Sequence, residues 1–308
     1  MIKYYSALII FILSLSIDLQ AQCFSSLNPV GGISNLLVLE KQTFKFIVSY
    51  NYGLMDEYFE GHKKTDYSLV EKADYNYLAA ILAYGFFNRF TLESELGYFL
   101  NKTYEFENAV SKGFGFNNIV ISPKFSLITN HDKRFYCSGS TGIKLPLTRE
   151  LQKVDMVEVP HELQPSTHAF GYVVQGFVVK ENSFRGLRYF FITRGEYNYK
   201  NKAGYRYGSY FSASAYLSKH LMYNRVKGDW TVILQLRNEF RGRDRINDRI
   251  VEYTGGYSLL VVPQINFTIK EKWNISLMGN IPVYQYFNGI QLATKFGIIL
   301  NFAGDFKL

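Results

Sequence analysis

Runs of ten or more residues with alternating apolar and polar side chains recur through most of this chain and constrain its fold more than any other feature. The clearest run is Arg89–Leu100, in which Leu92 and Leu96 fall on one face and Glu93 and Glu95 on the other. Alternation with a period of two is typical of a strand. Ten residues are the length that a tilted strand needs to cross a bilayer.

Eleven further segments show a similar pattern. In Asp229–Phe240, for example, Leu234 and Leu236 lie opposite Gln235 and Arg237. About twelve strands, an even number, is typical of single-chain bacterial barrels. The sequence therefore predicts an all-β fold, a transmembrane antiparallel up-and-down β-barrel of about 12 strands. The other expected strands are Thr43–Met55, Ala73–Phe86, Phe116–Ile128, Phe135–Pro146, Thr167–Lys180, Leu187–Lys200, Tyr205–Ser218, Tyr257–Lys270, Trp273–Tyr284 and Gln291–Phe302.

The connections between these segments alternate in length. Short links such as Phe87-Asn88 and Glu271-Lys272 interleave with longer ones such as Asp56–Lys72 and Leu147–Ser166. Transmembrane barrels join their strands by short periplasmic turns and longer external loops. We therefore expect one barrel domain over residues 43–308, with its short turns and both of its ends in the periplasm.

Composition agrees with a barrel wall. The chain has 25 Tyr and 26 Phe, yet its charged fraction is 19% and its mean hydropathy is −0.08. Lipid-facing and lumen-facing residues cancel in that average, and aromatic residues gather in girdles at both interfaces. The net charge of +8 favours anionic partners. The partners that we expect are outer-membrane lipid, lipopolysaccharide, the barrel-assembly machinery and a small-molecule solute, but not nucleic acid.

The first residues predict export. Residues 1–21 contain Lys3, the apolar stretch Ala7–Leu15 and a cleavage sequence at Leu19–Ala21, which is the order found in a signal peptide. The expected location is therefore the outer membrane of a Gram-negative bacterium. Cys23 lies where a lipidated cysteine would, although Gln22 before it is not the small residue expected there.

Residues 22–42 lack strand alternation and contain the turn-rich sequence Asn28–Gly32. Apolar side chains such as Phe24 and Leu39 would be costly to leave in water. This lead is either a periplasmic segment or a plug inside the barrel. The plug candidates are Pro29, Gly31 and Gly32.

Charged residues on the expected inward faces are the main functional signal. They can line a wet channel, or pair across neighbouring strands and fill a narrow lumen, since about twelve strands lie between small packed barrels and open porins. The lumen-lining candidates are Arg89, Glu93, Glu95, Lys124, Lys144, Arg188, Arg194, Glu196, Arg237, Glu239 and Lys295.

The sequence signals for metal binding, phosphate binding and catalysis are weaker. Acids and histidines gather in Val154–His168, but Pro160 and Pro165 exclude a helix that would put them on one face; we expect a solvated loop, no metal and no cofactor. The loop Arg241–Arg249 can bind phosphates or pair its own charges. No expected strand carries His and Ser two positions apart on one face, so we expect no enzyme.

Several motifs resemble a family of outer-membrane proteins named for the meta-pathway of phenol degradation. Gly113–Asn117 resembles its Gly-x-Gly-Asp turn, with Asn117 in place of Asp, and Lys124–Leu127 resembles its Lys-Tyr-x-Leu strand. Gly142–Pro146 resembles its Lys-Leu-Pro strand end, and Pro282–Leu292 its final hairpin. The resemblance implies a barrel of this size and uptake of small, often hydrophobic compounds; it implies no catalytic residue.

The first hypothesis is therefore a channel or transporter for small, possibly hydrophobic, solutes. The alternative is a structural or interaction barrel with a filled lumen, whose loops bind lipopolysaccharide or a partner protein. An exported soluble β-sandwich is a third interpretation.

Overall fold

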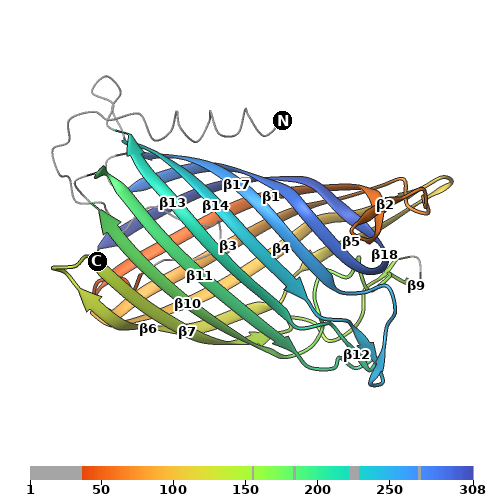
Figure 1. Ribbon diagram of the computed structural model, residues 1–308. Coiled ribbons are helices and arrows are strands. Elements are labelled where there is room, and N and C mark those ends of the chain that lie inside the picture. The colour runs from red at the N-terminus through yellow and green to blue at the C-terminus, as the bar shows by residue number, and fades with distance from the viewer. Residues whose placement is uncertain (1–36, 155, 183–184, 222–228, 270–271, 308) are drawn as a thin grey trace, which may run out of the picture.

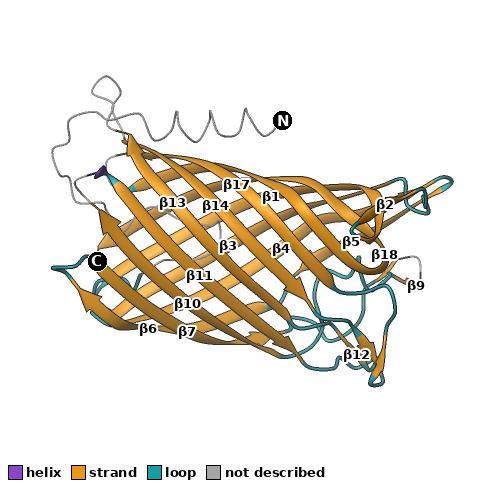
Figure 2. Ribbon diagram, viewed as in Figure 1, coloured by secondary structure: helices purple, strands orange, loops and turns teal. Residues whose placement is uncertain are grey.

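The computed structural model describes residues 37–154, 156–182, 185–221, 229–269 and 272–307. Most of them form antiparallel strands that wrap into a single barrel (Figures 1 and 2). No helix within these ranges is both long and apolar enough to cross a membrane. The strands that form the wall are β1 (Thr43–Gly61), β3 (Lys72–Phe87), β4 (Phe90–Phe106), β6 (Ile119–Asn130), β7 (Phe135–Leu145), β10 (Gly171–Asn182), β11 (Leu187–Asn198), β13 (Tyr210–Leu221), β14 (Asp229–Arg241), β17 (Gly256–Ile269) and β18 (Trp273–Lys307).

The barrel is closed because β18 pairs with both β17 and β1. The ring therefore contains eleven named strands, close to the expected twelve, each antiparallel to its neighbours. Two further strands extend the wall: β2 (Lys63–Thr65) pairs with β1, and β5 (Ala109–Phe116) pairs with β4. Because the ring is closed, each of its eleven strands has a hydrogen-bonded neighbour on both sides.

Strand β18 has two arms. Its residues from Trp273 to Phe287 pair with β17, whereas those from Phe287 to Lys307 pair with β1. Side chains from the two arms meet, because Trp273 stacks on Phe302 with ring centroids 5.3 Å apart. The chain reverses near Gly289, which has a φ of 79°, a conformation that costs glycine little. The expected Asn-Gly hairpin thus lies within β18.

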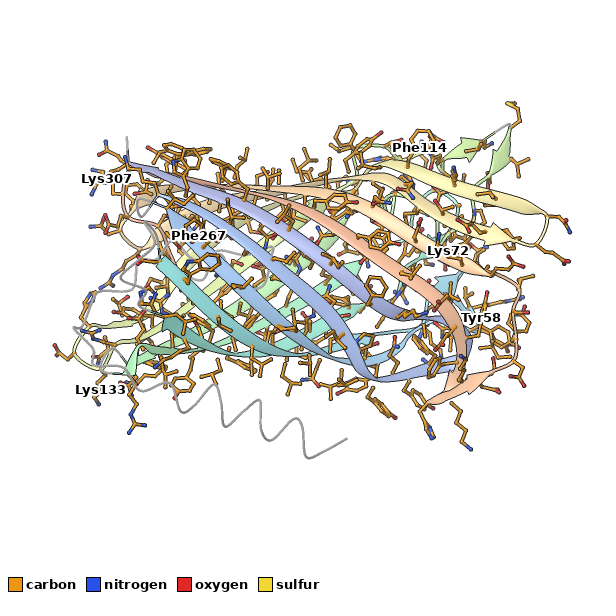
Figure 3. The ribbon with its side chains drawn as sticks, turned by 90° about the horizontal axis from the view of Figure 1, so that it is seen from above. Tyr58, Lys72, Phe114, Lys133, Phe267 and Lys307 are labelled. Atoms are coloured by element: carbon orange, nitrogen blue, oxygen red, sulfur yellow. The ribbon has the colours of Figure 1, made fainter. Side chains whose placement is uncertain are left out.

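Alternation along each strand separates two surfaces. Apolar side chains point outward along the barrel and remain exposed, as Figure 3 shows, while their sequence neighbours point inward. On β14, for example, Leu234 is 40% exposed and Gln235 is 1% exposed. The facing predicted for Asp229–Phe240 and Arg89–Leu100 agrees with this pattern.

The two ends of the barrel differ. Short turns lie at the end that carries the C-terminus, where Asn88-Arg89 joins β3 to β4 (Figure 1). The longer connections lie at the opposite end, which we call the loop end. They contain β8 (Lys153–Val154), β9 (Val157–Glu158), β12 (Tyr205–Arg206), β15 (Arg245–Ile246) and β16 (Arg249–Ile250).

Several strand bounds differ from those expected. Strand β1 continues to Gly61 and β4 to Phe106, because the wall extends beyond the expected spans as the β1–β2 and β4–β5 hairpins. Tyr205 belongs to a small sheet of β12, β15 and β16, and the wall strand β13 begins only at Tyr210. Residues after Phe302 also stay in the wall, since they pair with the first residues of β1.

Candidate functional site in the barrel interior

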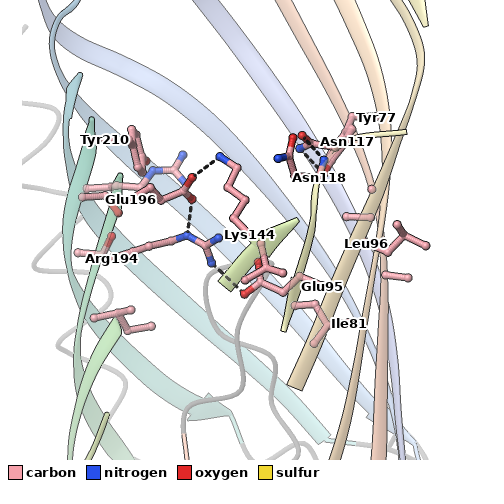
Figure 4. A pocket seen from close by; sticks show the side chains of 18 of the residues that line it. Tyr77, Ile81, Glu95, Leu96, Asn117, Asn118, Lys144, Arg194, Glu196 and Tyr210 are labelled. Atoms are coloured by element: carbon pink, nitrogen blue, oxygen red, sulfur yellow. Dashed lines mark hydrogen bonds and ion pairs between the residues drawn. The ribbon is translucent and has the colours of Figure 1, made fainter. Parts of the chain in front are cut away.

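Four charged side chains form a network across one side of the lumen. Arg194 on β11 places Nη1 2.9 Å from Glu95 Oε1 on β4 and Nε 2.7 Å from Glu196 Oε1. Lys144 on β7 completes it, with Nζ 2.9 Å from Glu196 Oε2 (Figure 4). The same Nζ lies 3.0 Å from Asn198 Oδ1. Strands β6, β7 and β10 lie between β4 and β11 in the sheet, so the contact between Arg194 and Glu95 spans the interior.

Strand alternation explains why these residues meet. Glu93, Glu95 and Gly97 share the inward face of β4, and Arg194 and Glu196 share that of β11. Each carboxylate in the network accepts from a cation, so the charges compensate one another inside the barrel. The network therefore narrows the lumen without leaving a lone charge.

A cavity of about 280 Å³ lies beside this network. Its opposite wall includes Tyr77, Ile81, Tyr216 and Gln235, which give it apolar and aromatic surface. Gln235 Nε2 donates to Ser214 Oγ at 3.1 Å, while Gln235 Oε1 is buried without a hydrogen-bond partner in the structure. The wall of the cavity thus contains an unused acceptor.

A second cavity of about 280 Å³ lies toward the loop end. Asn117 and Tyr210 line both cavities, so the two are neighbours along the barrel axis. The second cavity is bounded by the connection between β7 and β10, including Gln164 and Pro165, and by Lys102 and Arg241 from the wall strands.

The β7–β10 connection folds into the barrel mouth. Leu163 and His168 in it are 1% and 2% exposed, although they belong to a loop. His161 stacks on Tyr205 with ring centroids 3.7 Å apart, and Tyr207 OH donates to His161 O at 2.9 Å. This loop is held at several points and constricts the mouth.

Burial shifts the pKa values of two groups at the mouth. It raises the pKa of Tyr207, and the negative charge of Asp244 acts in the same direction. Burial lowers the pKa of His168, against the opposing effect of its contact with Thr148 O. Burial therefore favours the neutral form of both side chains.

The end opposite the loops is packed more densely. Lys124 is fully buried, with Nζ 2.8 Å from Glu93 Oε1 and 4.0 Å from the centroid of the Phe177 ring. Leu37 packs against the interior cluster that contains Phe177. Leu39 is also buried, and its N–H donates to Thr91 Oγ1 at 2.8 Å. Residues of the lead segment therefore contact the inner wall.

Most of the predicted charged residues lie on inward faces, but two do not. Arg89 lies in the exposed turn between β3 and β4, because the strand begins one residue later than expected. Lys295 is half exposed and pairs with Asp56, because irregular pairing between β1 and β18 changes its facing there. Of the other predicted residues, those outside the central network also have partners. The pairs are Glu93–Lys124, Arg188–Glu181 and Arg237–Glu239.

Residues 1–36 fall outside the described part of the chain, and with them the signal peptide, Cys23 and the plug candidates Pro29, Gly31 and Gly32. Sequence reasoning missed Lys102, because the expected strand ends at Leu100, whereas β4 continues to Phe106 and a register shift near Leu100 turns Lys102 inward. It also missed Tyr210 and Gln235, since uncharged residues gave no signal. Gln235 did lie on the predicted polar face.

The expectation that no strand carries His and Ser two positions apart on one face is wrong. Strand β13 extends to Leu221, so Ser218 and His220 lie two positions apart on the same inward face. His220 Nδ1 lies 3.4 Å from Thr231 Oγ1, and its Nε2 lies 4.0 Å from Asp229 Oδ1. These contacts tie His220 to the neighbouring strand β14.

The structure also describes most of the two loop motifs noted in the sequence, Arg241–Arg249 and Val154–His168. In the Arg241–Arg249 stretch, Asp244 is buried and accepts from Arg241, Tyr205 OH and the Gly208 N–H, so part of the stretch pairs internally. No group of three or more His, Cys, Asp or Glu side chains in the described ranges could hold a metal ion.

Comparisons with known proteins support the fold. No protein-family model and no curated protein matches the chain, so the family resemblance stays a prediction. A solved outer membrane channel from Pseudomonas putida F1 is similar, with a TM-score of 0.68 and 12% identity over 91% of this chain and 99% of that one. At this identity the likeness shows the barrel fold alone.

Two other solved structures are more distant. LpxR from Salmonella typhimurium has a TM-score of 0.41 and 10% identity, covering 85% of this chain and 99% of that one. The outer membrane protein OprG from Pseudomonas aeruginosa has a TM-score of 0.19 and 8% identity, covering 88% and 100%. Neither likeness is close enough to support an argument.

Proposed function

We propose that this chain is an outer-membrane channel that admits small solutes from the loop end into a constricted lumen. The observation that carries the proposal is the pair of neighbouring cavities, which share Asn117 and Tyr210 and extend from the loop end to the network around Arg194. A lumen packed throughout by side chains would have no such series of spaces.

The outer surface supports the membrane location. Apolar side chains such as Val174, Phe191 and Leu236 are exposed around the barrel, at 59%, 45% and 44%. A soluble protein seldom exposes an apolar surface of this extent, whereas a barrel wall in lipid requires it. The fold shared with the channel from Pseudomonas putida F1 is consistent with this location.

The interior favours small solutes with some apolar character. Each cavity is near 280 Å³, at the lower end of the range for ligand sites. Ile81, Ile192 and Tyr216 contribute apolar surface beside the charged network. Uptake of a hydrated ion alone would not need such surface.

A second candidate function rests on the opposite end. The buried pair of Lys124 and Glu93, with Phe177 beside it, fills the interior there. If this packing never opens, the protein is a structural or interaction barrel whose loops bind lipopolysaccharide or a partner protein. The cavities would then be internal voids rather than parts of a path.

Liposome swelling separates the two candidates. Purified protein is reconstituted into liposomes, and swelling is followed in isosmotic solutions of neutral solutes of increasing size. The channel predicts swelling with the smallest solutes and a steep loss as solute size grows. Protein that is folded, as judged by heat-modifiable migration on a gel, but gives no swelling with any solute would support the filled barrel.

A further inference from the structure

One inward-facing cation of the described wall strands differs from the others in its hydrogen-bonding partners. Inward-facing lysines and arginines on the wall strands pair with carboxylates, as Lys45 does with Asp305 and Lys144 with Glu196. Lys102 is the exception among the described residues, since it forms no ion pair with a carboxylate. Its Nζ donates to Gln164 O at 3.0 Å and lies 5.1 Å from the centroid of the Phe99 ring.

This ammonium group retains hydrogen-bonding capacity. A lysine carries three N–H donors, and the carbonyl of Gln164 uses one of them. The Phe99 ring stabilises the charge but accepts no strong hydrogen bond. Lys102 therefore presents at least one donor and an unneutralised positive charge to the cavity that it lines.

Arg241 adds a second positive charge to the same cavity. Its Nη2 contacts both carboxylate oxygens of Asp244, at 3.0 and 3.1 Å, which leaves its other guanidinium nitrogens for a ligand. Glu162 also lines the cavity but is exposed at the rim and pairs with neither cation among the described residues. Because Arg241 is already paired with Asp244, Lys102 supplies the uncompensated charge, and Arg241 supplies further N–H donors for an anion in the same space.

The other residues that line the cavity indicate the chemistry of the rest of the ligand. Phe99, Pro165 and Tyr210 give the cavity apolar and aromatic surface. We propose that Lys102 and Arg241 form a binding site at the mouth for a small carboxylate with a short apolar body. The site selects the solutes that enter the lumen, so this role rests on the proposed channel function, although binding itself does not.

Three four-carbon probes test the charge requirement in detergent-solubilised protein, where no conductance is needed. Butyrate, butanol and butylamine each contain four carbon atoms, have apolar chains of three or four carbons, and differ in the charge of the head group at pH 7. We expect calorimetric titration to show binding of butyrate and at least tenfold weaker binding of the other two. Equal affinity for butylamine and butyrate would overturn the site.

Variants then test the residues. Lys102→Met removes the charge and keeps the chain length, and we expect it to weaken butyrate binding about tenfold, the effect of losing one charge-assisted hydrogen bond. Lys102→Arg should retain most of the affinity. The matched control is Lys112→Met, which removes an exposed charge from the adjacent strand β5 and should leave binding unchanged.

Heat-modifiable migration confirms that each variant is folded. A folded Lys102→Met protein that binds butyrate as tightly as the wild type would refute the proposal. Butyrate binding that depends on Lys102 in a barrel that shows no swelling would instead keep the site and reject the channel. In a conducting barrel, the reversal potential in a KCl gradient should shift toward cation selectivity in Lys102→Met.

Discussion

Arg194 and Glu95 are 99 residues apart in sequence, yet Arg194 Nη1 lies 2.9 Å from Glu95 Oε1. Their strands, β11 and β4, are separated by three others in the sheet, so the pair joins distant parts of the wall through the lumen. Glu196 and Lys144 extend the contact. This network braces the barrel and narrows the lumen beside the first cavity.

Removing one member of the network should destabilise the barrel. Arg194→Met leaves Glu95 with no cation and Glu196 with only Lys144, and breaking a buried pair in this way typically costs about 3–5 kcal/mol. Urea unfolding in lipid vesicles measures the change. In a double-mutant cycle with Glu95→Gln, the double variant should lose less unfolding free energy than the sum of the losses of the two single variants. Additive effects would show that the two residues do not interact in the folded protein.

A surface pair provides the comparison. Lys64 and Glu57 also form an ion pair, with Nζ 2.7 Å from Oε1, but their side chains are 60% and 39% exposed. Lys64→Met should therefore change the unfolding free energy by less than about 1 kcal/mol.

The facing of β14 predicts a second result. Leu234 points outward from the middle of this strand, and Leu234→Arg should cost about 2–4 kcal/mol because hydrocarbon cannot solvate the guanidinium near the bilayer midplane. Leu147→Arg, at an exposed leucine in the β7–β10 connection, is the control and should have little effect. Equal costs in refolding titrations would show that the outer face of β14 is not in lipid.

Orientation gives a third prediction. Epitope tags inserted near Lys63 or Glu150, at the loop end, should be accessible to antibody on intact cells. Tags near Asn88 or Lys272, in the short turns, should be accessible only after the outer membrane is permeabilised. The reverse labelling pattern would place the loop end in the periplasm.

The lead segment gives a fourth prediction. The N–H of Leu39 donates to Thr91 Oγ1 inside the barrel, and Leu37 packs on the interior cluster, so these two residues narrow the end opposite the loops. Deletion of residues 24–39, with residues 1–23 retained, should raise single-channel conductance without preventing folding. Thr91→Val, which removes only the bond to Leu39, should have a smaller effect. Unchanged conductance in the folded deletion variant would exclude a plug.

Much of the wall could be predicted because alternation depends on local sequence. Leu234 and Gln235 show opposite faces directly in the order of the residues, and the Asn288-Gly289 turn is a strong hairpin signal. The positions of Lys102 and Lys295 could not be predicted, since each follows an irregularity in strand pairing that reverses the facing. One shifted residue exchanges inside and outside.

The central site was only partly predictable for a related reason. Glu95, Lys144, Arg194 and Glu196 could be assigned to inward faces one strand at a time. Their partners could not, because the pairing of Arg194 with Glu95 depends on barrel curvature that brings non-neighbouring strands together. The fold of the β7–β10 connection into the mouth also depends on long-range contacts, such as that between Tyr207 and His161.

Single-channel recording of the purified wild-type protein in planar bilayers tests the channel most directly. We expect discrete, small conductance steps, because the network around Arg194 narrows the lumen and a cavity remains beside it. Arg194→Ala should give larger steps through the same barrel. Repeated recordings without steps, from wild-type and Arg194→Ala protein that are both shown to be folded and inserted, would contradict the account.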